Sequence, residues 1–196
     1  MGKNVVVLIG LLILGGIMAI VLWLLVFLPF RVMQPVEFIP LDIPDGAAEE
    51  LEQKLNRFIA GADATIELSR VDLGVLIIHG VEGELGLDVA ALAVELGKSN
   101  MTTIINVEIG DIPSSGYLTW ILTRRDVEHT TTLISAEVWD ENGNVAYDLL
   151  DFRIGKFKIP NVITRRLMGE QTRSIEGVYI QEMEFRDNYI RVTQRM

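Results

Sequence analysis

His79 and His129 are the only histidines in this chain of 196 residues, so any zinc centre or Ser-His-Asp triad would have to use one of them. Neither lies in an H-E-x-x-H spacing, and no G-x-S-x-G segment is present to form a nucleophile elbow. The chain has no cysteine, which excludes disulfides, thiolate metal sites and cysteine nucleophiles. The residue inventory therefore predicts a protein that is not an enzyme and that needs no cofactor.

The candidate metal site consists of Asp140, Asn142, Asn144 and Asp148, whose spacing is that of oxygen ligands in a calcium loop. The sixth position of such a loop needs glycine for a sharp turn, whereas this chain has Val145 there. The residues on both sides also alternate as strands do. An ordinary β-hairpin is therefore the favoured interpretation, and a calcium site is the weaker alternative.

Glu182 and Glu184 form a close pair of carboxylates that could in principle exchange protons with a substrate. Such chemistry requires a pocket that shifts the two pKa values apart. Residues two positions apart on a strand share a face. The alternation around this pair predicts a strand whose solvent-facing side carries both carboxylates.

The overall charge limits the possible partners of the chain. It contains 27 Asp or Glu against 17 Lys or Arg, a formal net charge of −10 at pH 7. Binding to nucleic acid depends on clustered Lys and Arg that contact phosphates. The charge balance therefore argues against nucleic acid as a partner.

An uncharged run of 26 residues extends from Val5 to Phe30. As a helix it would be about 39 Å long, more than the roughly 30 Å hydrocarbon core of a bilayer. The apolar region of a cleaved signal peptide is usually about 7–15 residues, so this alternative fits less well. Trp23, Phe27 and Phe30 gather near the end of the run, where aromatic rings suit the membrane interface. We therefore expect a transmembrane helix over about residues 5–30.

Residues within and beside this run indicate whether another helix can pack against it and how it is oriented in the membrane. Gly15 and Ala19 form a small-xxx-small pair that would let another helix approach closely. Lys3 and Arg31 flank the two ends, so the positive-inside signal is nearly balanced. A short tail precedes the run and a large domain follows it. We expect a single-pass protein of the cell membrane whose C-terminal domain is extracytoplasmic.

The expected organisation has three parts: a transmembrane anchor at residues 1–30, an extended linker at residues 31–44, and an extracytoplasmic α+β domain at residues 45–196. The linker contains three prolines, which disfavour a helix. Ala47 to Ile59 then carries apolar residues at helical spacing, and Asp45 or Gly46 can cap this helix.

Strands dominate the remainder of the expected domain. Asn142-Gly143 between two apolar runs is the strongest hairpin signal, because both residues tolerate positive φ. Residues 89–96 fit either a short helix or a buried strand, and this choice stays open. Short helices are expected over residues 117–122 and after Pro160. The other strands are expected at residues 64–68, 71–79, 102–109, 130–139, 145–154, 174–185 and 189–192.

These patterns give the expected fold class. It is α+β: an N-terminal transmembrane helix followed by a mostly antiparallel, curved β-sheet domain with two to four short helices.

The order of these elements also suggests a family. The segments are Phe38-Ile39-Pro40-Leu41, a helix ending Leu55-Asn56-Arg57-Phe58, and Phe157-Lys158-Ile159-Pro160 before a short helix. This order resembles that of small single-pass bacterial envelope proteins of unknown function, whose outer domains are similar to tubular lipid-binding proteins. The resemblance implies a long curved sheet wrapped around a helix, with an apolar groove for an acyl chain.

Two functions follow as hypotheses. The first is a membrane-tethered, non-catalytic protein that binds lipid or another hydrophobic ligand at the cell envelope. The second is an assembly or scaffold subunit of a membrane protein complex. The expected partners are the lipid bilayer and either a lipid ligand or other membrane protein subunits.

Overall fold

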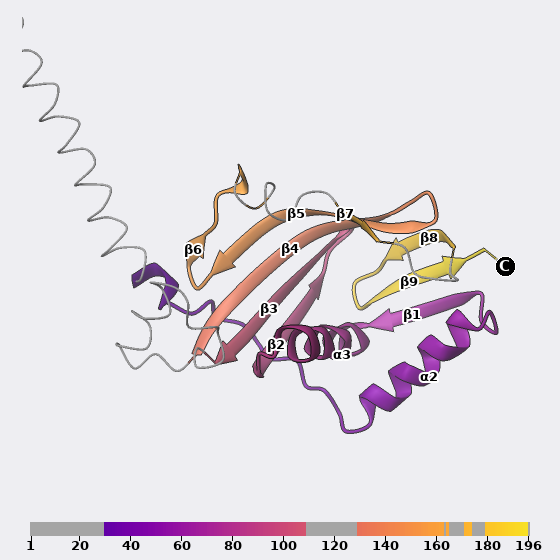
Figure 1. Ribbon diagram of the computed structural model, residues 1–196, viewed down its shortest axis with the longest axis horizontal. Coiled ribbons are helices and arrows are strands. Elements are labelled where there is room, and N and C mark those ends of the chain that lie inside the picture. The colour runs from indigo at the N-terminus through magenta and orange to yellow at the C-terminus, as the bar shows by residue number, and fades with distance from the viewer. Residues whose placement is uncertain (1–29, 109–128, 163, 165–170, 174–178, 196) are drawn as a thin grey trace, which may run out of the picture.

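Two antiparallel β-sheets and a small number of helices form the domain, which is α+β (Figure 1). The computed structural model describes residues 30–108, 129–162, 164, 171–173 and 179–195. Within these residues, no helix combines the length and apolar character needed to cross a membrane. The expected anchor before Phe30 and the expected helix at residues 117–122 lie outside the described residues.

The larger sheet has six strands among the described residues, and its main path follows chain order from β2 to β6. The strand β2 settles the choice left open for residues 89–96, which form a strand. The short strand β7 pairs with β5 beside this path. The bounds are β2 Val89–Leu96, β3 Asn100–Glu108, β4 His129–Glu141, β5 Asn144–Ile154, β6 Phe157–Lys158 and β7 Gln171–Arg173.

The long strands β4 and β5 form the expected hairpin, and the structure confirms that prediction. Asn142 and Gly143 at its turn have φ of 51° and 85°. Two consecutive positive φ values give the turn whose twist matches that of the flanking strands. Further along, Ser135 pairs with Asp151 and Ala136 pairs with Leu149, so β5 contains a bulge at Leu150. The bulge keeps Leu149 and Phe152, which lie on either side of it, on one face of the sheet.

The smaller sheet has the order β1-β9-β8, with β1 Thr65–Ser69, β8 Ile180–Phe185 and β9 Tyr189–Gln194. The family resemblance implies one long curved sheet, whereas the described residues form two. The division arises because a helix follows β1 directly, so that β1 pairs with the distant strand β9 rather than with β2.

That helix is α3, Arg70–Gly80, and it shows that the strand predicted at residues 71–79 is wrong. Ser69 caps it: the Ser69 hydroxyl accepts a hydrogen bond from the Asp72 backbone, and the Asp72 carboxylate accepts one from the Ser69 backbone. This reciprocal capping box is a strong helix start signal. The prediction failed because the segment is apolar on all sides, and such a run has no period that separates a buried helix from a buried strand. A π-helical turn, Val81–Leu85, continues it.

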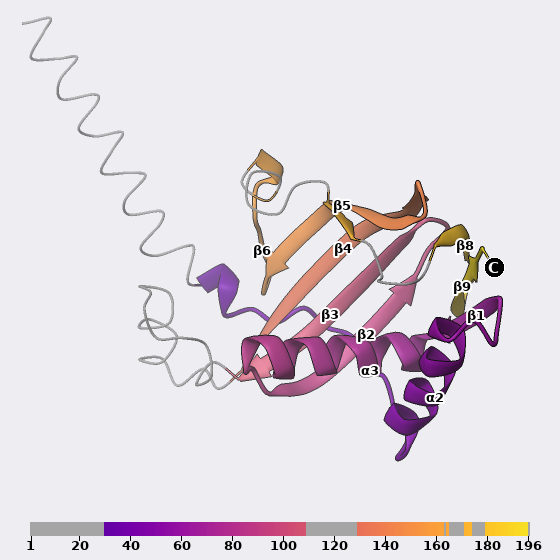
Figure 2. The same ribbon diagram turned by 45° about the vertical axis from the view of Figure 1, so that its right-hand side comes forward.

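The helix α2, Ala47–Ile59, confirms the predicted helix, and Gly46 precedes it with a left-handed φ of 86°. Figure 2 shows α3 lying across the strands of the larger sheet, while α2 lies beside the smaller sheet. The main core fills the space between these layers. Its buried residues are Phe58, Ile66, Leu73, Leu92, Val94, Ile105, Val107, Ile180, Ile190 and Val192.

Residues 35–44 form neither helix nor strand and are nevertheless held against the domain. The Val36 backbone donates a hydrogen bond to Thr131 Oγ1 at 2.8 Å, and the Leu41 backbone donates one to the Leu92 carbonyl at 2.7 Å. Gly74 of α3 permits the close approach, since a Cβ there would lie 2.8 Å from Leu41 Cδ2. This segment therefore joins the start of β4 to the edge strand β2.

Candidate functional site: an apolar cavity

An apolar cavity of about 240 Å³ lies where α2, α3 and the two sheets meet. The thirteen described residues that line it all carry aliphatic, aromatic or thioether side chains, so the described part of its wall offers no polar side chain to a ligand. They are Leu55, Phe58, Ile59, Ile66, Leu68, Leu73, Met101, Val138, Val145, Ile180, Met183, Ile190 and Val192.

The smaller sheet supplies one wall of the cavity through the alternation of its strands. Ile66 of β1 is opposite Val192 of β9, and Leu68 is opposite Ile190, so these four side chains form two cross-strand pairs on one face. Met183 of β8 lies opposite Val192 and extends the same face. The wall is therefore built from β-branched, leucine and methionine side chains that point away from solvent.

The tip of the β4–β5 hairpin supplies a second wall through Val138 and Val145. The hairpin is joined to the smaller sheet at its turn, where the Ile180 backbone donates a hydrogen bond to the Gly143 carbonyl at 2.9 Å. The ring of Tyr179 packs on this turn, and a Cβ at position 143 would lie 2.3 Å from its Cε2. Only glycine satisfies both the positive φ and this contact.

The helices close the cavity from the other side, and an ion pair fixes their mutual position. Lys54 Nζ on α2 lies 3.1 Å from Asp72 Oδ1 at the start of α3, and Asp72 is only 4% exposed. Burial raises the pKa of Asp72, but the hydrogen bonds from Ser69 and Lys54 outweigh burial and hold that pKa below its ordinary value. The pair places Leu55, next to Lys54, and Leu73, next to Asp72, in the cavity wall.

Gln194 of β9 fixes the other end of α2. Its buried amide donates hydrogen bonds to the carbonyls of Phe58 and Asp63, the latter at 2.9 Å. The Phe58 carbonyl belongs to the last turn of α2 and also accepts a hydrogen bond from the Gly61 backbone at 3.0 Å. The Gln194 amide therefore ties this last turn to β9 and holds the Phe58 ring over the smaller sheet.

The cavity opens to solvent beside the end of α2, because Ile59 lines it and is 48% exposed. A larger hollow of about 490 Å³ lies next to it, between α2 and β1. That hollow is lined mostly by charged and polar residues, and Arg57 pairs there with Asp63 at 3.0 Å. We therefore take the smaller cavity, whose described lining is apolar, as the candidate site.

The residues of the candidate calcium loop lie along the hairpin. Asp140 is opposite Val145, whereas Asp148 is opposite Glu137, three residues earlier on β4. Because side chains alternate along a strand, Asp140 and Asp148 lie on opposite faces of the hairpin. The Asn144 amide donates to the Asn142 carbonyl at 3.5 Å. In the described part of the chain, no group of three or more His, Asp or Glu residues is placed to hold a metal.

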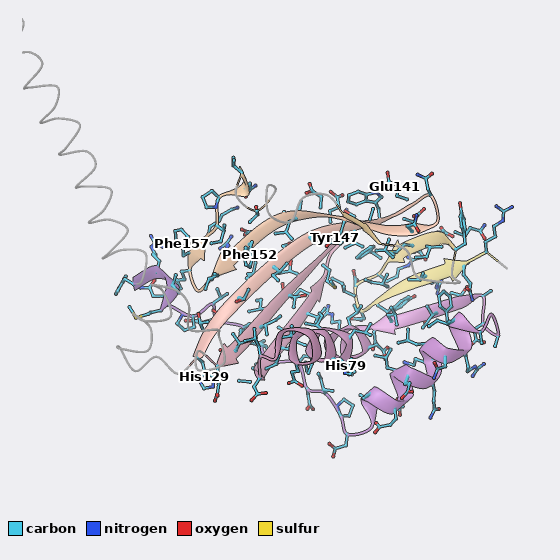
Figure 3. All side chains as sticks on the ribbon, viewed as in Figure 1. His79, His129, Glu141, Tyr147, Phe152 and Phe157 are labelled. Atoms are coloured by element: carbon cyan, nitrogen blue, oxygen red, sulfur yellow. The ribbon has the colours of Figure 1, made fainter. Side chains whose placement is uncertain are left out.

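The other residues with possible chemistry are also separated. Figure 3 shows His79 on α3 and His129 at the start of β4. Glu182 and Glu184 flank Met183, which lines the cavity, so they face the opposite side of β8, as their spacing predicts. There Arg191 pairs with Glu184 at 3.5 Å.

None of the cavity residues was singled out as a site residue by sequence. Ser69-x-x-Asp72 before an apolar run was the available signal for α3 and hence for one wall. Of the expected anchor residues, Val5, Gly15, Ala19, Trp23 and Phe27 lie outside the described part of the chain. Phe30, the first residue that the structure describes, is 53% exposed.

Comparisons of this chain with protein-family models, with curated proteins and with solved structures found no match.

Proposed function

We propose that this chain is a membrane-tethered, non-catalytic protein that binds one alkyl chain of a lipid or of another hydrophobic ligand. The observation that carries the proposal is the cavity at the junction of the two sheets and α2, in which every described lining residue has an apolar side chain. Ligand sites in proteins are mostly apolar hollows, and a site for an alkyl chain needs no polar group along its length.

An unfilled cavity of this size would be costly to keep. Residual cavities destabilise proteins by about 24 cal/mol per Å³, so an empty volume of about 240 Å³ corresponds to about 6 kcal/mol. This is an upper bound, because the cavity opens to solvent. Even so, it is large beside a total folding free energy of about 5–15 kcal/mol. A ligand that fills the cavity would recover much of this free energy.

The volume sets the size of the ligand. An apolar cavity of about 150 Å³ accommodates benzene, which has six carbon atoms. In proportion, about 240 Å³ holds about ten carbon atoms. Met101 and Met183 in the lining can adapt to the shape of a flexible chain. The proposed occupant is therefore a single chain of about ten carbons, or that length of a longer one.

The proposed tether is the uncharged run from Val5 to Phe30. It holds the domain at the surface of a bilayer. The resemblance to envelope proteins with tubular lipid-binding domains points to the same role and stays a prediction.

Native mass spectrometry of the full-length chain, extracted gently from membranes, tests the proposal. We expect a bound lipid mass that is lost in Val145→Phe, because the phenyl ring enters the cavity. Leu150→Phe is the matched control, since Leu150 lies on the same strand, outside the cavity, and is 41% exposed. The proposal fails if the wild-type chain never carries lipid, or if Val145→Phe carries as much as Leu150→Phe.

A second candidate function is assembly with other membrane protein subunits. It is favoured by a groove of about 290 Å³ between α2 and α3, in which Leu76 is 38% exposed. Glu52 of α2 lines this groove beside its apolar residues, so the groove suits an amphipathic helix of a partner that carries a basic residue opposite Glu52. Crosslinking in intact membranes from a cysteine placed at Leu76 would detect such a partner. If no adduct recurs between preparations, this candidate is rejected.

A further inference from the structure

The first described residues are fixed to the larger sheet by several contacts. The Lys156 backbone donates a hydrogen bond to the Arg31 carbonyl at 3.0 Å. Val32 is only 2% exposed, and its carbonyl accepts a hydrogen bond from Thr130 Oγ1 at 3.4 Å. Together with the bond from Val36 to Thr131, these contacts leave the segment little freedom to move relative to β4.

Gly155, in the turn between β5 and β6, shows how close this packing is. Its φ is 55°, and a Cβ at this position would lie 2.2 Å from the Val32 carbonyl oxygen. Only glycine can occupy the position without moving the backbone of Val32. The β5–β6 turn is thus in direct contact with the residues that follow Phe30.

This contact determines where the domain lies if the preceding run is in lipid. The uncharged run ends at Phe30, so Arg31 would mark the boundary between hydrocarbon and headgroups. The Lys156 backbone is 3.0 Å from Arg31 and would share that depth. Figures 1 and 2 agree that residues 30–34 and β6 lie at one end of the molecule, while α2 and the smaller sheet lie at the other.

The surface at this end has the composition of a membrane-contacting surface. Phe30 is 53% exposed and Val162, a few residues after β6, is 80% exposed. Arg31, Lys156 and Lys158 are exposed basic residues of the same region, and Lys158 also pairs with Asp151 at 3.2 Å. Exposed apolar side chains beside Lys and Arg suit the interface of a bilayer that contains anionic lipids.

We infer that this end of the domain, formed by residues 30–32, the β5–β6 turn and Val162, rests on the headgroups of the bilayer that holds the anchor. The domain then has a fixed orientation, with the apolar cavity at the end remote from the membrane. This inference rests on the proposed tether and adds the surface through which the domain meets the bilayer.

Site-specific fluorescence quenching tests this inference on the full-length chain. The chain has no cysteine, so a single introduced cysteine carries the only label. The probe sites are Val162→Cys at the expected contact and Ala62→Cys in the exposed turn between α2 and β1. Each labelled chain is reconstituted into vesicles of phosphatidylcholine and phosphatidylglycerol that contain a nitroxide-headgroup lipid. We expect several-fold stronger quenching at position 162 than at position 62.

The outcomes separate the inference from the proposed function. If the chain fails to float with the vesicles, the tether itself is rejected. If it floats but both probes are quenched equally, the inference alone is overturned. Gly155→Val in the Val162→Cys chain should lower the quenching, because it disrupts the contact with Val32. Should that variant fail to fold, the comparison of positions 162 and 62 decides the question without it.

Discussion

The size of the cavity leads to a prediction about chain length that can be worked through quantitatively. Burying one methylene group contributes about 0.8 kcal/mol, which is about fourfold in affinity. The cavity of about 240 Å³ accommodates about ten carbon atoms. Across a series of n-alkanols, we expect affinity to rise about fourfold per carbon up to about ten carbons and then to level off, since further carbons stay in water.

Val145→Phe sharpens this prediction. The substitution adds about four carbon atoms to the wall, so the affinity should level off at about six carbons instead. For an alkanol of about ten carbons, the loss of about four buried carbons corresponds to about 3 kcal/mol, or about two-hundredfold in affinity. Leu150→Phe should bind as the wild type does, because this residue lies outside the cavity.

Isothermal titration calorimetry of a fragment covering residues 30–196 measures these affinities, after circular dichroism has verified that the fragment and both variants fold. A plateau near ten carbons that moves to shorter chains in Val145→Phe would support the assignment of the cavity. An affinity that keeps rising by the same factor well beyond ten carbons would refute it. Equal binding by the two phenylalanine variants would refute it as well.

Further predictions concern the contacts that build the site, and urea unfolding of the same fragment measures each one. At pH 7, Asp72→Asn should lower the free energy of unfolding by about 1.5–3 kcal/mol, because the charged acceptor is lost. The pKa of Asp72 is lowered in the folded state, so the carboxylate's contribution to the free energy of unfolding is complete above about pH 4 and is lost as the pH falls through the folded-state pKa. If the wild type stays more stable than Asp72→Asn by the same amount below that pKa, this reasoning is contradicted. Gly155→Ala should cost about 1–2 kcal/mol or more through its φ of 55° and the contact with Val32, and an unchanged midpoint would count against that packing. Gly143→Ala should cost about as much. In a Tyr179→Ala background, Gly143→Ala should cost less, because the clash with the Tyr179 ring is gone and only the cost of the positive φ remains. If the two substitutions lower the free energy of unfolding by the full sum of their separate effects, the contact between them is contradicted.

The elements that the sequence predicts correctly carry their signals locally. The helix α2 has an apolar face at helical spacing, and the β4–β5 hairpin has Asn142-Gly143 between two alternating runs. In both cases a few neighbouring residues determine the backbone, so a single sequence suffices.

The elements that it misses depend on distant partners or carry apolar residues without a helical or strand period. The helix α3 is apolar all round, so only the capping residues Ser69 and Asp72 distinguish it from a strand. The pairing of β1 with β9 joins Thr65 to Thr193, and no local pattern records such a partner. This pairing creates the second sheet and one wall of the cavity.

The cavity shows most clearly which features the sequence alone does not predict. Ile66, Leu73 and Val192 read as ordinary core residues in the sequence, and in the structure they are core residues. What makes them a candidate site is the space that their side chains leave unfilled together with Met101 and Val145. That space depends on how two sheets and two helices pack, and the apolar pattern of each segment is the same whether the space is filled or open.

Photolabelling maps the position of a bound chain and tests the central claim most directly. The full-length protein in its membrane is irradiated with an alkyl-diazirine lipid whose reactive carbon lies near the end of the chain, and the labelled peptides are identified by mass spectrometry. We expect labels on residues that line the cavity, foremost Met101, Met183 and Phe58, and their loss in Val145→Phe but not in Leu150→Phe. Labels confined to exposed apolar residues such as Ile39, which is 90% exposed, would contradict the claim that the cavity binds an alkyl chain.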